Sequence, residues 1–141
     1  SDNENKLLKK EIESQNKIKI QSIKEDIIKN ISSENDANIY IGEIDLDPKS
    51  IKELCFILSD IYENLFLILL SKSNDKVFMS CFISKELIEE KGLDASKIIK
   101  KLSPLINGSG GGQSFYATGG GSNLAGINLV ISESKKIVSQ I

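Results

Sequence analysis

The chain has 141 residues, a hydrophobic fraction of 40% and a formal net charge of −2, and it contains no histidine. This length supports one domain with a helical extension, and the apolar fraction can supply its core. Without histidine, the serine–histidine and cysteine–histidine nucleophile systems are excluded, as is the commonest zinc ligand.

The first 33 residues predict one long helix. Apolar residues recur at helical spacing from Leu8 to Ile31, and neither Gly nor Pro interrupts residues 4–32. Such a helix needs a partner along its apolar stripe, which is the domain, a second copy or a preceding segment of a longer protein. We therefore divide the chain into a helical part, residues 1–33, and a globular part, residues 34–141.

The globular part predicts an α/β (α+β) fold, in which a small β-sheet is covered by helices on at least one face. We expect a strand over 38–46, a helix from Pro48 to about Tyr62, a hairpin of strands over 65–71 and 77–83, two short helices capped by Ser84 and Asp94, and a last helix from about Leu124 to Ile141. Pro104 is expected to end or kink the second short helix.

Cys55 and Cys81 lie inside separate apolar runs, which predicts two buried free thiols and no disulfide. Unpaired cysteines and a charged N-terminus without a signal-peptide pattern favour a cytoplasmic protein. The longest apolar run, residues 65–70, is far too short to span a bilayer. The chain has no clustered acidic motif, so no metal site is predicted.

Charge is distributed unevenly along the chain. Residues 34–90 contain five lysines and twelve acidic residues, whereas residues 91–141 contain six lysines and two acidic residues. The basic C-terminal third is therefore the part suited to an anionic partner. Aromatic residues make up only 6% of the chain, which predicts few stacking platforms for single-stranded nucleic acid.

The basic third contains eight of the ten glycines, all between Gly108 and Gly126. We interpret this segment as a glycine-rich loop whose exposed main-chain N–H groups bind phosphate or a carboxylate. A flexible linker is the alternative. The spacing excludes a P-loop and disfavours a dinucleotide site. Phe115 and Tyr116, between the two glycine blocks, are either buried beneath the loop or stacked on an RNA base.

The segment resembles the glycine motif of the DHHA1 domain, in the form found at the C-terminus of bacterial alanyl-tRNA synthetases (the C-Ala domain). The matching residues are Gly108, Gly110, Gly111, Gly112, Ala117, Gly119, Gly120 and Gly121. Ser114 and Phe115 stand where the commonest version has Pro and an acidic residue. The DHH phosphoesterases share the domain type, but they usually have His at the place of Gln113 and carry upstream catalytic motifs that this chain lacks.

The resemblance implies a non-catalytic domain that binds tRNA-Ala around its elbow and helps to position it for aminoacylation and editing, in the service of protein biosynthesis. ATP, magnesium and zinc would belong to upstream domains of the parent enzyme, and no cofactor to this segment. The helical part could mediate homodimerisation. The alternatives are a dimerisation or interaction module and an accessory substrate-binding domain of a DHH-type phosphoesterase.

RNA contacts are expected at the basic end of the chain, through main-chain N–H groups, hydroxyls and lysines. The predicted residues are Gly110, Gly111, Gly112, Gln113, Ser114, Thr118, Gly119, Gly120, Gly121, Lys97, Lys100, Lys101, Lys135 and Lys136.

Overall fold

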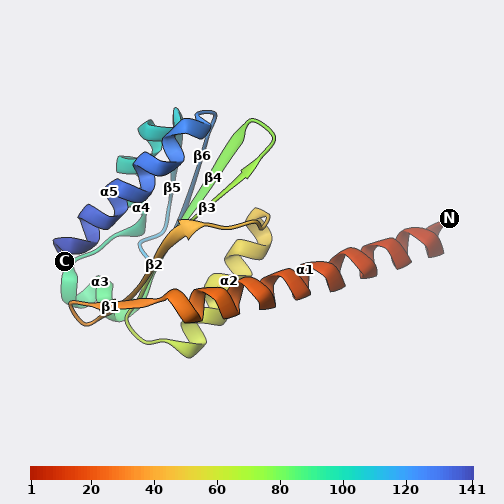
Figure 1. Ribbon diagram of the computed structural model, residues 1–141, viewed down its shortest axis with the longest axis horizontal. Coiled ribbons are helices and arrows are strands. Elements are labelled where there is room, and N and C mark those ends of the chain that lie inside the picture. The colour runs from red at the N-terminus through yellow and green to blue at the C-terminus, as the bar shows by residue number, and fades with distance from the viewer.

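The computed structural model describes all residues, Ser1–Ile141, and confirms a mixed α/β fold in which one open sheet lies between two layers of helices (Figure 1). The α-helices are α1 (Asp2–Asn30), α2 (Pro48–Ile61), α3 (Lys85–Lys91), α4 (Ala95–Leu102) and α5 (Ile127–Ser139). The strands are β1 (Ser32–Glu34), β2 (Ala37–Glu43), β3 (Leu65–Ser73), β4 (Lys76–Ile83), β5 (Gly108–Gly112) and β6 (Tyr116–Gly121). Two short 3₁₀ turns are η1 (Ser103–Ile106) and η2 (Leu124–Gly126).

The strand order across the sheet is β1-β2-β3-β4-β6-β5. Only β2 and β3 pair in parallel, and α2 is the crossover helix that connects them. All other neighbouring strands pair antiparallel. None of the helices combines the length and the apolar character that crossing a membrane requires.

The central strand β3 is buried on both faces, as its continuous apolar run predicts. Leu65, Leu67 and Leu69 pack into a cluster with α1 and α2, while the alternate side chains pack into a second cluster with α4 and α5. The sheet therefore has a hydrophobic core on each face, and each layer of helices packs against one of the two faces.

The long helix α1 belongs to the globular part only in its second half. Ile20 and Ile27 are buried against α2, whereas Leu8 and Ile12 on the same stripe are each 56% exposed. The first half projects away from the rest of the molecule (Figure 1). The division at residues 33 and 34 stays a prediction, but the last turns of α1 contribute to the core of the domain.

The glycine-rich segment is not the loop that its composition predicts, but a β-hairpin at the edge of the sheet. Residues 108–112 pair with 117–121 in antiparallel register, and β6 also pairs with β4. Within residues 108–121, the connecting turn, residues 113–115, is the only part outside a strand. Glycine has a low strand propensity, so composition alone concealed these two strands.

The hairpin is rich in glycine because α4 and η1 lie directly against it. A β-carbon on Gly110 would lie 2.8 Å from Ile99 Cγ2 of α4 and would also overlap the Thr118 carbonyl oxygen of β6. One on Gly121 would overlap the Ile106 carbonyl oxygen of η1. A β-carbon on Gly119 would lie 2.9 Å from Ser103 Oγ and 3.2 Å from Ile99. Glycine is therefore needed at these positions for internal packing. This corrects the interpretation that the glycines are there to expose the main chain to a ligand.

Gly120 and Gly111 are the exceptions in the hairpin. The nearest atom to a β-carbon on Gly120 would be 3.6 Å away, an ordinary van der Waals contact. On Gly111 the nearest would be Lys100 Cε at 3.4 Å, at the flexible end of a side chain. Only at these two glycines of the hairpin would a β-carbon fit without displacing neighbouring atoms.

The same substitution at the adjacent glycines of β6 should therefore change the free energy of unfolding by very different amounts. We expect Gly121→Ala to lower the free energy of unfolding by about 2 kcal/mol or more, because the added methyl group overlaps backbone that cannot move freely. Gly120→Ala should change it by less than about 1 kcal/mol. Urea unfolding followed by circular dichroism measures both, and equal effects would contradict the packing argument.

Candidate nucleic-acid interface

Two adjoining grooves lie on the α2 side of the sheet, where α2 covers β3 and β4 and leaves the β6–β5 hairpin open. The first, of about 650 Å³, lies between α2 and the hairpin. We call it the aromatic groove, and its lining side chains are Pro48, Lys49, Lys52, Phe56, Phe78, Gln113, Phe115, Tyr116, Ala117 and Thr118, together with Gly111 and Gly112.

The aromatic groove brings together four of the eight Phe and Tyr residues of the chain. Phe56 and Phe115 are 40% and 44% exposed, and the ring centroids of Phe56 and Tyr116 lie 6.3 Å apart. The fold thus gathers rings that are 60 residues apart in the sequence, which the low aromatic content does not reveal. Burial beneath the hairpin, one of the two alternatives for Phe115 and Tyr116, does not hold for the exposed Phe115, whereas Tyr116 is half-buried.

The charge around the aromatic groove is positive. Lys49 and Lys52 come from the first turns of α2, and no carboxylate lines the groove. Lys52 Nζ lies 5.6 Å from the centroid of the Tyr116 ring, in cation–π range. Burial raises the pKa of the Tyr116 hydroxyl to about 12, so its side chain contributes a neutral ring to the groove at physiological pH.

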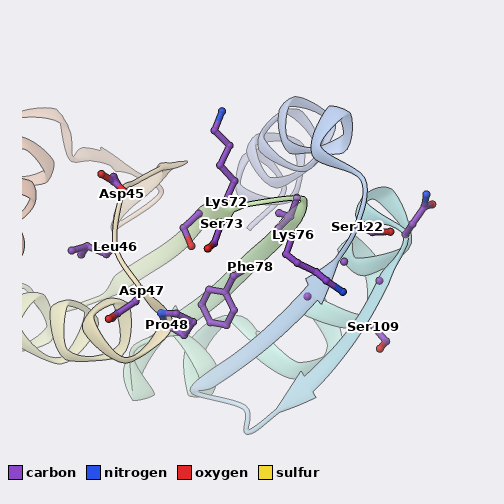
Figure 2. A pocket seen from close by; sticks show the side chains of 16 residues that line it. Asp45, Leu46, Asp47, Pro48, Lys72, Ser73, Lys76, Phe78, Ser109 and Ser122 are labelled. Carbon is purple, nitrogen blue, oxygen red and sulfur yellow. The ribbon is translucent and has the colours of Figure 1, made fainter.

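The second groove, of about 750 Å³, has mixed charge (Figure 2). Lys72 and Lys76 line it, but so do Asp45 and Asp47. Asp47 caps α2 by accepting a hydrogen bond from the Ser50 N–H at 2.7 Å, and hydrogen bonding to Ser50 lowers the pKa of its carboxyl. The two grooves meet at Pro48 and Phe78, which line both.

The structure brings only part of the predicted site together. Gly111, Gly112, Gln113 and Thr118 line the aromatic groove, and Gly120 and Gly121 line the mixed-charge groove. Gly110 is on the exposed sheet edge, and Gly119 is buried beneath α4. Ser114 is exposed in the hairpin turn, where its carbonyl oxygen accepts a hydrogen bond from the Ala95 N–H at 2.9 Å.

The predicted lysines are dispersed. Lys97 and Lys101 lie on the opposite face of the molecule, beside the C-terminal end of α5, while Lys100 reaches the sheet edge next to Gly111. Lys135 lies over β2, at the other end of the sheet, and Lys136 forms an ion pair with Glu133 at 3.2 Å. Lys49 and Lys52 were not among the predicted residues, because they lie in the acidic part of the chain.

Residues 35–140 match the profile of the DHHA1 domain. The chain belongs to the DHHA1 domain family. It is 37% identical to the alanine–tRNA ligase of Christiangramia forsetii over 96% of this chain, and 36% identical to that of Flavobacterium psychrophilum over the same share. It spans only 16% and 15% of those proteins.

Solved structures show the same fold for this DHHA1 domain. The C-Ala domain of Aquifex aeolicus alanyl-tRNA synthetase superimposes with a TM-score of 0.67 and 23% identity, over 77% of this chain and 99% of that one. A DHH-domain protein described as a member of the S1P family of ribosomal proteins superimposes with a TM-score of 0.52 and 14% identity. That match covers 84% of this chain and 30% of the other one. The comparisons confirm the resemblance to the DHHA1 domain, and the fold is that of the C-Ala domain.

The DHHA1 domain has no group of three or more side chains arranged to hold a metal ion. Cys55 and Cys81 are free and buried, as predicted. Burial raises the pKa of Cys55 to about 12 and also raises that of Cys81, so neither thiol ionises near neutral pH. Neither is suited to act as a nucleophile, because the thiolate is the reactive form.

The two thiols should therefore resist modification in the folded domain. We expect no reaction with an aromatic disulfide reagent at about pH 8, and reaction of both cysteines after denaturation in urea. Release of the coloured thiol leaving group measures the number of reactive cysteines. Rapid modification of Cys55 without denaturant would show that α2 opens away from the sheet.

Proposed function

We propose that this DHHA1 domain binds tRNA-Ala as the C-terminal part of an alanine–tRNA ligase, and helps to position the tRNA for aminoacylation and editing by upstream domains. The observation that carries the proposal is the aromatic groove, which has two lysines and no carboxylate beside the glycine hairpin. Family membership and the ligase relatives support the same partner. ATP, magnesium and zinc would be held by the upstream domains, with no cofactor in this one.

In this proposal the phosphate backbone follows the α2 side of the hairpin. Lys49 and Lys52 neutralise phosphates, and Thr118 and Gln113 offer hydrogen bonds to phosphate or ribose. Lys100 adds a positive charge at the sheet edge beside Gly111. The net charge of −2 opposes binding at long range, so the isolated domain should bind weakly and act through its effective concentration in the parent enzyme.

A salt series of binding to folded tRNA-Ala tests the proposed surface. We expect Lys49→Gln/Lys52→Gln to weaken binding at low salt. It should also reduce the slope of log K against log salt by about 1 for each phosphate that is no longer neutralised. Fluorescence anisotropy of labelled tRNA measures both quantities.

Lys135→Gln/Lys136→Gln is the matched control, because it removes the same charge from the far end of the sheet. Equal effects of the two pairs would show that only overall charge matters and would contradict the groove as the site. Equal affinity for folded tRNA and for short oligonucleotides would favour the alternative of a phosphoesterase accessory domain.

We also propose that α1 forms a homodimer. The observation that favours it is the exposed apolar stripe on the projecting half of α1, where Leu8 and Ile12 lie one turn apart and are each 56% exposed. These side chains would be buried by the same stripe of a second copy.

Light scattering on the full chain tests the dimer. We expect Leu8→Lys/Ile12→Lys to give a monomer, whereas Asn3→Lys/Ser14→Lys, which adds the same charge at exposed polar positions on the opposite face of the same half-helix, should remain dimeric. A monomeric parent chain at high micromolar concentration would refute this second role without affecting the first.

A further inference from the structure

We propose that the aromatic groove holds one unpaired nucleobase of the bound RNA by stacking against Phe56 and Phe115. This inference rests on the proposed function, because it names the part of the RNA that the same surface takes. The two phenylalanine side chains are 40% and 44% exposed, and no other element of the chain covers their exposed surface. Exposed rings in a cationic groove are the usual components of single-strand binding sites.

The Phe56 ring is held in place before any ligand arrives. It packs edge-to-face on the buried Phe82 ring, with centroids 5.9 Å apart and an interplanar angle of 77°. Its other aromatic neighbour is the half-buried Tyr116 ring, whose centroid lies 6.3 Å away. Little side-chain freedom is left to lose when a base stacks on such a ring, so the contact contributes more fully to affinity.

Phe115 presents its side chain from an equally fixed backbone. Its carbonyl oxygen accepts a hydrogen bond from the Ile83 N–H at 2.9 Å, and the neighbouring turn residue, Ser114, is tied to α4. The turn therefore holds the exposed Phe115 ring in the lining of the groove. Phe56 comes from α2, so the groove is lined by exposed rings from both the helix and the hairpin.

Charge complementarity selects a nucleotide over other flat or apolar ligands. Lys49 and Lys52 border the groove without any competing carboxylate, which suits the phosphates on either side of the stacked base. Thr118 and Gln113 are available to hydrogen-bond the edge of the base or the ribose 2′-hydroxyl. The base must be unpaired, because both faces of a base within a duplex are already stacked.

The test uses the full chain and a short single-stranded RNA that contains 2-aminopurine, whose fluorescence falls when it stacks on an aromatic ring. We expect quenching by the parent chain and none for a duplex of the same sequence. Phe56→Leu/Phe115→Ala should abolish the quenching and weaken binding of the oligonucleotide and of folded tRNA-Ala by roughly ten-fold. The salt slope should not change, because every phosphate keeps its lysine.

Ile61→Ala is the matched control for Phe56→Leu, since Ile61 is 51% exposed on the same helix and lies outside the groove. Circular dichroism establishes that each variant is folded. Unchanged quenching in the folded double variant, or equal quenching by single-stranded and duplex RNA, would overturn the stacking site. If Lys49→Gln/Lys52→Gln still weakened tRNA binding in that case, the proposed function would hold without the stacking site. Absence of tRNA binding by the parent chain would refute both proposals.

Discussion

The arrangement of the whole C-terminal half depends on the close approach of α4 and η1 to the β5–β6 hairpin. That approach requires Gly110, Gly119 and Gly121, because a single methyl group at any of them would meet backbone or buried side chains. Close packing of this kind holds the edge of the sheet firmly without large apolar side chains on the hairpin itself. The hairpin is therefore a thin, stiff layer that is supported from one face only.

This one-sided support creates the candidate site. With α4 and η1 occupying one face, the other face of the hairpin is free of helices, since α2 sits over β3 and β4. The gap between α2 and the hairpin becomes the aromatic groove. The glycines let α4 and η1 pack closely on one face of the hairpin. The opposite face stays uncovered, and there it forms one wall of the candidate site.

The sequence predicted the parts of the fold that have a strong local pattern. The apolar run of β3, the start of α2 at Pro48 and the Asp94 cap of α4 were all predicted where the structure has them. The strands β5 and β6 were not, because glycines carry no alternation of apolar and polar side chains. The aromatic groove could not be foreseen either, since Phe56, Phe78 and Phe115 are brought together only by the strand order.

The unbroken course of α1 has a mechanical consequence. The helix is anchored at Ile20 and Ile27 and then continues to Asp2 without a Gly or Pro that could act as a hinge. At 1.5 Å per residue, its free half carries Asp2 roughly 27 Å beyond the anchor at Ile20. Inserting one residue into that half would rotate Asp2 by about 100° around the axis relative to the sheet. The exposed half of α1 is therefore a continuous helical rod, and under the proposed function its length sets both the distance and the rotation between the groove and the upstream domains.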